Sequence, residues 1–260
     1  MKLFDSFPAR YVAPNAVTCV GLVFGLASIR TSLTATGPEG FATAAWFILY
    51  AVLLDKLDGA VARRLNASSE FGVQLDSFSD FVTFGISPAA LVSRAVPTLL
   101  PEPWSSGLAA TALQAVAAVY VLAAAARLAK FNLTTATNDP RFFRGLPSTS
   151  SGGLLASAFL AHQSLSLPAA WLTGLVVWMA SNLVLMVSNL PMPKLKISPN
   201  PVVKAGQLVV MLTVYVFIPL HRFAPYLIAL STLYTVGGFI YGVAVTSREA
   251  DPAPAVEQRA

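Results

Sequence analysis

The sequence predicts an all-α polytopic membrane protein, a bundle of about eight transmembrane helices with six as the lower limit. Three observations lead to this fold class. The chain has 260 residues, of which 55% are hydrophobic and only 11% are charged, and its mean hydropathy is +0.66. A typical soluble domain has roughly 25% charged residues. Apolar stretches long enough to cross a bilayer recur along the chain, and basic residues gather in alternate connections between them.

The elements follow from a search for apolar stretches of roughly 20 residues, the length that a transmembrane helix needs. Such stretches lie at 15–36, 41–65, 73–95, 107–130, 146–165, 168–189, 203–220 and 224–246. The fifth and the seventh are the weakest, which gives the range of six to eight. The first 14 residues mix aromatic, apolar and basic side chains, as expected for a segment at the membrane interface. Residues 248–260 are polar and rich in Pro and Ala, so we expect a disordered tail after one membrane domain at 1–247.

The basic residues predict the orientation. With eight helices and a cytoplasmic N-terminus, the cytoplasmic side collects Lys2, Arg10, Arg63, Arg64, Lys130, Arg141, Arg144, Lys194, Lys196, Lys204, Arg248 and Arg259. The outer side keeps only Arg222 in a connection, with Arg30 and Arg94 near helix ends. Because cytoplasmic connections of membrane proteins are enriched in Lys and Arg, both termini are expected in the cytoplasm, with the chain in the cytoplasmic (inner) membrane.

The charge and the cysteine content exclude other classes. A net charge of +5 fits a basic rim against anionic lipid head groups, and nothing in the pattern indicates a nucleic-acid partner. The single cysteine, Cys19, excludes a disulfide framework.

Four aspartates interrupt the second and third apolar stretches. Asp55 and Asp58 are three residues apart, and Asp76 and Asp80 are four apart, so each pair lies on one face of its helix. Ionised carboxylates are costly in hydrocarbon and need cations nearby. Oxygen donors without Cys or His suit Mg2+ or Mn2+. The sequence therefore predicts a two-metal site, since one divalent ion would leave two negative charges uncompensated.

Residues 55–80 match the pattern D-x-x-D-G-x-x-A-R-x8-G-x-x-x-D-x-x-x-D, which Asp55, Asp58, Gly59, Ala62, Arg63, Gly72, Asp76 and Asp80 fill. Gly59 and Gly72 clear the aspartate faces of their helices, and Ala62 continues the small stripe, which leaves a slot for a nucleotide. Arg63 lies where its helix reaches the interface and is expected to grip a diphosphate. In this stretch the sequence closely resembles the CDP-alcohol phosphotransferase family.

The resemblance implies roles for these residues. It implies that Asp55, Asp58 and Asp76 are ligands to two divalent cations, Mg2+ or Mn2+, and that Asp80 both contacts a metal and deprotonates the acceptor alcohol. The implied reaction is direct displacement at the β-phosphorus of a CDP-activated lipid, with CMP released. The segment PNAVTCVGLVFGL at 14–26 is also similar to the family, and implies that Asn15 and Thr18 contact the nucleotide.

Three further stretches resemble the serine-using branch of the family: RLAKFN at 127–132, FFRGLP at 142–147 and LMVSNLPMPKLK at 185–196. They imply transfer of a phosphatidyl group from CDP-diacylglycerol to L-serine. The serine carboxylate needs fixed cations, for which Arg127, Lys130 and Arg144 are candidates, with Asn132 supporting the loop. Two differences, Lys130 where the branch has arginine and STSSGG after GLP, keep other acceptors open: glycerol 3-phosphate, inositol or its phosphate, and choline.

A cation-coupled transporter is the alternative function from another class. It would also place acids inside the membrane, but the sequence shows no related halves and no interrupted helices around these acids.

The family resemblance also implies a homodimer. The small-residue pattern GLVFG at 21–25 could form a dimer seam or pack helices within the chain.

Overall fold

The computed structural model describes residues 11–67, 69–134, 139, 141–194 and 197–250. The segment at 1–10, the basic residues Lys2, Arg10, Lys196 and Arg259, and residues 251–260 of the expected tail therefore lie outside the described residues. The helices are α1 (Val12–Thr34), α2 (Pro38–Arg64), α3 (Glu70–Asp80), the π-helical turn η2 (Phe81–Ile86), α4 (Ser87–Leu99), α5 (Pro101–Trp104), α6 (Gly107–Thr134), α7 (Ser148–Ser164), the 3-10 turn η3 (Ala169–Leu172), α8 (Thr173–Val187), α9 (Pro201–Phe217) and α10 (Ala224–Ala250). The strands are β1 (Phe142–Arg144) and β2 (Pro191–Pro193).

The prediction of an all-α polytopic membrane protein is confirmed. Within the described residues, six helical stretches are long and apolar enough to cross a membrane: Val12–Thr34, Pro38–Arg64, Glu70–Leu99, Gly107–Thr134, Ala169–Val187 and Ala224–Ser247. The other two predicted segments, the fifth and the seventh, form the shorter helices α7 and α9, of 17 residues each.

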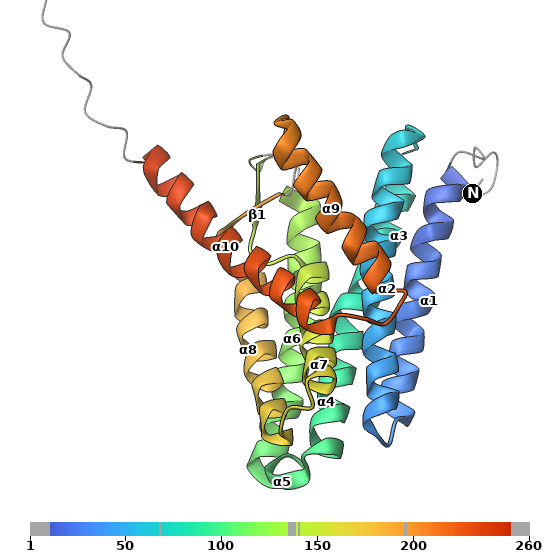
Figure 1. Cartoon of the computed structure of the whole chain (residues 1–260), viewed down its shortest axis with the longest axis vertical. Helices are drawn as coiled ribbons and strands as arrows, with labels where there is room; N and C mark the ends of the chain where they lie inside the picture. Colours follow the sequence, from blue (N-terminus) through green and yellow to red (C-terminus); the bar gives the residue numbers. More distant parts are fainter. Residues whose placement is uncertain (1–10, 68, 135–138, 140, 195–196, 251–260) are drawn as a thin grey trace, which may run out of the picture.

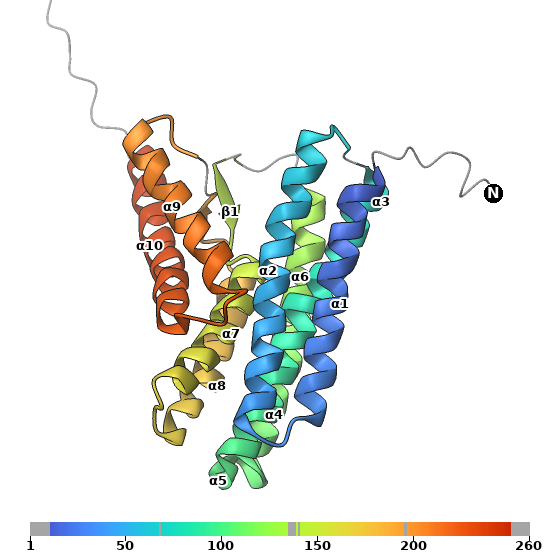
Figure 2. The ribbon, with the colours of Figure 1, turned by 45° about the vertical axis from the view of Figure 1, so that its right-hand side comes forward.

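The bundle has two ends that differ in content (Figures 1 and 2). The start of α1, the α2–α3 connection, the strands and the end of α10 lie toward one end, here called the aspartate end. The α1–α2 connection and α5 lie at the other, here called the α5 end. Local sequence sets these boundaries: Pro38 begins α2 after Gly37, and the Ser69 hydroxyl accepts a hydrogen bond from the Gly72 amide at the start of α3.

The helix α7 explains why the fifth apolar stretch is weak. Its residues from Ser148 to Ala161 are buried except Ser150, so their neighbours are other helices rather than lipid. Small residues permit this approach, because a Cβ atom at Gly152 would lie 3.2 Å from Cα of Phe84. The Tyr120 hydroxyl, fully buried, donates to the carbonyl of Phe84 at 3.0 Å and lies 2.9 Å from Ser151 Oγ. The core thus joins α6, η2 and α7.

Two sequence segments that resemble the serine branch meet in space. Residues Phe142–Arg144 and Pro191–Pro193 pair as an antiparallel ribbon, with Phe143 opposite Met192. Gly145, with a φ of 76°, ends the ribbon where a side chain would collide with the carbonyls of Leu185, Met186 and Ser188. The ribbon lies at the aspartate end (Figures 1 and 2).

The connection between α9 and α10 lies partway along the bundle rather than at its α5 end (Figures 1 and 2). There the His221 ring stacks on Trp46 of α2, with centroids 4.6 Å apart, and its Nε2 lies 3.0 Å from the Tyr50 hydroxyl. The Tyr215 hydroxyl donates to the Leu53 carbonyl at 3.1 Å. The sequence predicts Arg222 in a connection on the outer side, whereas this hairpin reaches only the middle of α2.

Candidate metal centre

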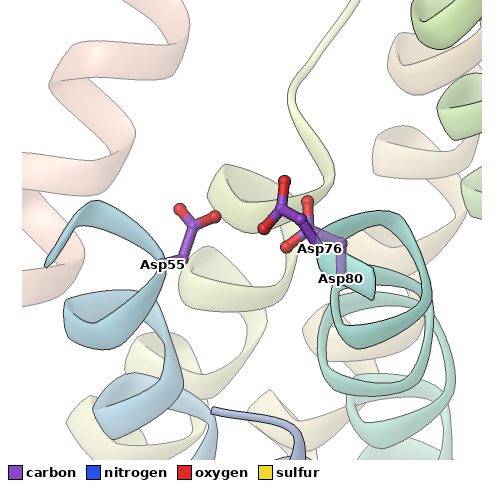
Figure 3. A group of neighbouring side chains, drawn as sticks. All are labelled: Asp55, Asp76 and Asp80. Carbon is purple, nitrogen blue, oxygen red and sulfur yellow. The ribbon is translucent and has the colours of Figure 1, made fainter. Parts of the chain in front are cut away.

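Three of the four motif aspartates converge between α2 and α3. Asp55, Asp76 and Asp80 each offer one carboxylate oxygen, and these oxygens all lie within 4.8 Å of one another. Figure 3 shows Asp55 on α2 facing Asp76 and Asp80 on α3. The four-residue spacing of the latter pair places both on one face of α3, as the sequence predicts. All three side chains are half-buried.

The donor set suits a divalent cation. Three carboxylates at this separation repel one another strongly in a partly buried site. The Lys56 ammonium lies 3.1 Å from Asp55, and within the described residues it makes the one ion pair found at the cluster. Carboxylate oxygens that converge in this way match the hard-oxygen preference of Mg2+ and Mn2+ and offer no Cys or His. The residues present therefore fit divalent metal binding.

Asp58, the fourth predicted ligand, is held by hydrogen bonds beside this group. Its Oδ2 accepts from the Thr18 hydroxyl at 2.8 Å and its Oδ1 from the Gly59 amide at 2.6 Å. The Thr18 hydroxyl also lies 3.1 Å from the Pro14 carbonyl. Thr18 and Asp58 are both buried, so α1 contributes directly to the position of an α2 carboxylate.

Asp58 and the three converging aspartates line one small cavity of about 10 Å3, which has room for roughly one water-sized group. Its lining consists of Thr18, Gly21, Ala51, Asp55, Asp58, Asp76, Ser79, Asp80, Thr83 and Phe84. Three segments, α1, α2 and the continuous stretch from α3 to η2, therefore build the site.

The π-helical turn η2 begins directly after Asp80. A π-turn inserts one extra residue into a helix and shifts the faces on either side of it. The shift lets Asp80 face α2 while Thr83 packs against Gly25 of α1. The Ser87 hydroxyl at the end of the turn lies within hydrogen-bond distance of the carbonyls of Val82, at 2.9 Å, and Gly25, at 3.0 Å. The GLVFG pattern thus packs helices within the chain.

Residues expected to contact a nucleotide surround the same end of α2 and α3. A Cβ atom at Gly59 would lie 3.3 Å from Arg63 Nη1, so the absent side chain lets the guanidinium lie along the aspartate helix. A Cβ atom at Gly72 would lie 3.1 Å from Asn15 Oδ1, which brings α1 and α3 together. Ala62 is half-buried in the last turns of α2.

Of the four residues expected to bind the acceptor, Arg127 is buried, whereas Lys130, Asn132 and Arg144 are not. Arg127 is 8% exposed; its Nη1 donates to Ser148 Oγ at 2.8 Å, and its Nε has no hydrogen-bond partner among the described residues. Arg127 interacts electrostatically with Asp80 and Asp55.

The other three lie further out. Lys130 donates to Asn189 Oδ1 at 2.7 Å, and the Asn132 amide donates to Ser77 Oγ at 2.9 Å. Arg144 is exposed on β1. The structure thus brings Arg127 near the aspartates, places Lys130 and Arg144 toward the ribbon, and holds Asn132 against α3.

Sequence reasoning missed several partners. Ser148 is the first residue of STSSGG, the stretch that differs from the serine branch, and it is the hydrogen-bond partner of Arg127. The bond between Thr18 and Asp58 joins residues 40 positions apart and has no spacing signal. Ser77 does carry a sequence signal, because it lies three residues before Asp80, a spacing that makes two side chains neighbours on a helix surface.

In sequence, the chain is similar to one family of known proteins. A family model described as CDP-alcohol phosphatidyltransferase matches residues 11–181. Three similar relatives are each named CDP-diacylglycerol--serine O-phosphatidyltransferase. The Helicobacter pylori relative is 32% identical over 190 residues, 72% of this chain and 73% of its own length. The Mycobacterium leprae relative is 30% identical over 225 residues, which are 84% of this chain and 69% of the relative. The Saccharomyces cerevisiae relative is 34% identical over 160 residues, which are 57% of this chain and 54% of the relative.

Proposed function

The chain belongs to the CDP-alcohol phosphatidyltransferase family, and we propose that it transfers the phosphatidyl group of CDP-diacylglycerol to the hydroxyl of L-serine, giving phosphatidylserine and CMP. The observation that carries the proposal is the convergence of Asp55, Asp76 and Asp80, three aspartates at motif positions, in one cavity between α2 and α3. The names of the relatives support the choice of serine.

Asp55, Asp76 and Asp80 would hold divalent cations, and we propose two ions, Mg2+ or Mn2+, with Asp58 as the fourth ligand. Asp58 lines the same cavity, and two ions would balance the four carboxylates. Bound divalent cations supply electrophilic stabilisation of negatively charged phosphoryl oxygens.

Asp80 is proposed as the general base. It ends α3 directly before η2, with its carboxylate among the converging oxygens of the cavity. The serine hydroxyl oxygen forms a bond to the β-phosphorus while the bond from that phosphorus to the bridging oxygen breaks. The serine proton passes to a carboxylate oxygen of Asp80, and CMP leaves with the electron pair of the broken bond.

The donor is proposed to lie along the cleared faces of α2 and α3. Arg63, whose guanidinium lies over Gly59, is placed to grip the diphosphate. Asn15, Thr18, Gly59, Ala62 and Gly72 complete the CDP-binding set. In this arrangement Thr18 has a second task, because its hydroxyl orients Asp58.

Arg127 is the proposed anchor for the serine carboxylate. It is buried, it interacts with Asp80, and its Nε lacks a partner among the described residues. A guanidinium with a free edge can bind a carboxylate in a two-pronged geometry, whereas the ammonium of Lys130 cannot. Lys130, Asn132 and Arg144 are proposed to form the outer wall of the acceptor pocket.

The chain is a multi-pass membrane protein, and we propose that it lies in the cytoplasmic (inner) membrane with the aspartate end and both termini in the cytoplasm. The basic residues at the end of α2, Arg63 and Arg64, support this orientation. The membrane domain is proposed to comprise residues 1–247, although α10 continues to Ala250. The homodimer that the family resemblance implies is also a proposal, testable by the mass of the particle in detergent.

The test is an acceptor screen on the purified full chain in detergent with CDP-diacylglycerol and Mn2+ or Mg2+. Serine, glycerol 3-phosphate, inositol, inositol phosphate and choline are supplied separately, and CMP and the lipid product are measured. The variant Asp80→Asn should lose turnover, and Asp139→Asn, which alters an exposed aspartate paired with Arg141, should keep it. CMP and phosphatidylserine formed only with serine support the proposal. Turnover with another alcohol alone overturns the acceptor, and no CMP with any alcohol overturns the activity.

A further inference from the structure

A groove of about 840 Å3 lies on the opposite half of the bundle from the aspartates, between α4 and α6 and bordered by α1 and α5. Its volume is within the range of about 300–1,000 Å3 usual for ligand sites. Neither the motif nor the proposed acceptor residues belong to it.

All polar side chains that line the groove lie in one half, together with Leu33, Pro97, Trp104 and Ala110, and the other half is apolar. Toward the α5 end its lining includes Ser93, Arg94, Thr98, Ser105 and Gln114. Toward the middle of the bundle its lining is Ile86, Ala89, Ala90, Ala117, Ala118 and Val121. From Ile86 at the end of η2 to Thr98 in α4, the helix rises by about 18 Å, which is slightly more than half of a roughly 30 Å hydrocarbon layer.

Two tryptophans indicate how deep in the membrane the polar half of the groove lies. Trp104 lines the groove, and its indole Nε1 donates to Thr173 Oγ1 at 3.2 Å. Trp171 is 65% exposed and belongs to η3, in the connection between α7 and α8. That connection lies toward the α5 end of the bundle (Figures 1 and 2). Because Trp side chains concentrate at the level of lipid head groups, the polar half lies at the membrane surface and the apolar half extends toward the bilayer centre.

Arg94 gives the groove its charge. Its side chain is exposed on α4, no ion pair is found for it within the described residues, and no acidic side chain is among the residues that line the groove. An arginine in a membrane helix needs water or an anion to compensate its charge. A guanidinium binds phosphate oxygens in a two-pronged geometry.

We propose that this groove binds a membrane phospholipid, with its phosphate on Arg94 and an acyl chain along the alanine-lined half. The order of polarity along the groove is that of one lipid leaflet, with the head group at the α5 end and the chain toward the centre. This lipid is held at the end of the bundle away from the proposed reaction, so it is a bound membrane component rather than a substrate in the aspartate cavity.

Native mass spectrometry of the delipidated full chain, titrated with phosphatidylglycerol, tests the proposal. We expect one phospholipid per chain on the unmodified protein and on Arg94→Lys. Arg94→Gln should lower the affinity by about tenfold or more, because a hydrogen-bonded charge contact contributes roughly that factor. Ala118→Phe, which fills the apolar half, should also lower it. Arg30→Gln is the matched control, since Arg30 is an exposed arginine of α1 toward the same end and is not part of the groove lining.

Circular dichroism and gel filtration verify that each variant is folded. The proposal is overturned if Arg94→Gln binds phosphatidylglycerol like the unmodified protein. It is also overturned if inorganic phosphate displaces the lipid while Ala118→Phe has no effect, because the groove would then bind only an anion. Loss of a dimer rather than loss of lipid in Arg94→Gln would instead identify the groove as an interface between two copies of the chain.

Discussion

The contact between Gly25 and Thr83 leads to a quantitative prediction. A Cβ atom at Gly25 would lie 2.5 Å from Thr83 Oγ1 and 3.1 Å from Thr83 Cα. The hydroxyl can rotate away, but Cα belongs to the backbone, so α1 and η2 must separate in Gly25→Ala. Such overpacking costs about 1–3 kcal/mol. Replacing a helical glycine by alanine returns about 1 kcal/mol, which leaves a net loss of about 0–2 kcal/mol.

Two other glycines serve as controls. The nearest atoms to a Cβ at Gly21, one helical turn earlier, lie at 3.8 Å, and nothing lies within 4 Å of a Cβ at Gly174 in α8. Both alanine variants gain the helix propensity without a collision. Gly25→Ala should therefore be about 1–3 kcal/mol less stable than either of them. The assay is unfolding of the full chain in detergent by increasing SDS, followed by circular dichroism. Equal stability of the three variants would refute the packing argument.

The same substitution should affect catalysis. Thr83 lies three residues after Asp80, so a displaced η2 also displaces the proposed general base. We expect CMP release by Gly25→Ala to fall by about tenfold, as misplacement of a catalytic group by a fraction of an ångström can cause. Gly174→Ala is the control here, because Gly21 lines the aspartate cavity. Unchanged turnover in a destabilised Gly25→Ala would show that η2 does not set the position of Asp80.

Three other predictions concern the site. Thr18→Val removes the hydroxyl that donates to Asp58 and should lower the free energy of unfolding by about 1.5–3 kcal/mol, whereas Thr18→Ser should keep it; equal stability of the two would contradict this bond. Arg127→Lys should raise the KM for serine by about tenfold or more with the KM for CDP-diacylglycerol unchanged, and a parallel rise in both would show a general loss of structure instead. Chelation with EDTA should abolish CMP release and Mn2+ or Mg2+ should restore it, so activity that survives EDTA would contradict metal binding at Asp55.

Much of the fold follows from local sequence. Apolar length predicts the six long helices, and the three- and four-residue spacings predict that the aspartates share helix faces. The fifth and seventh apolar stretches, 146–165 and 203–220, predict a membrane-spanning helix less clearly than the others, each for a different physical reason. α7 is surrounded by protein, so it uses Ser and Gly where lipid would require larger apolar groups. α9 is short and has no buried residue.

The remainder depends on contacts between distant residues. Nothing near Asp58 in the sequence indicates that Thr18 holds it, and nothing near Arg127 indicates Ser148. The pairing of Phe142–Arg144 with Pro191–Pro193 joins two three-residue segments that are too short for a period-2 pattern. The hairpin of α9 and α10 stops at Trp46 through an aromatic stack that hydropathy does not register.

The π-helical turn at Phe81–Ile86 makes the length of this segment as important as its composition. Each residue of an α-helix turns the chain by about 100°, so deleting one residue here would restore regular α-helix and rotate everything before it relative to everything after it. Asp76 and Asp80 could then face α2 only if Leu91, Val92 and Ala95, all buried, left the core. Insertions and deletions should therefore be absent from this stretch in functional variants, even where substitutions that preserve side-chain size are accepted.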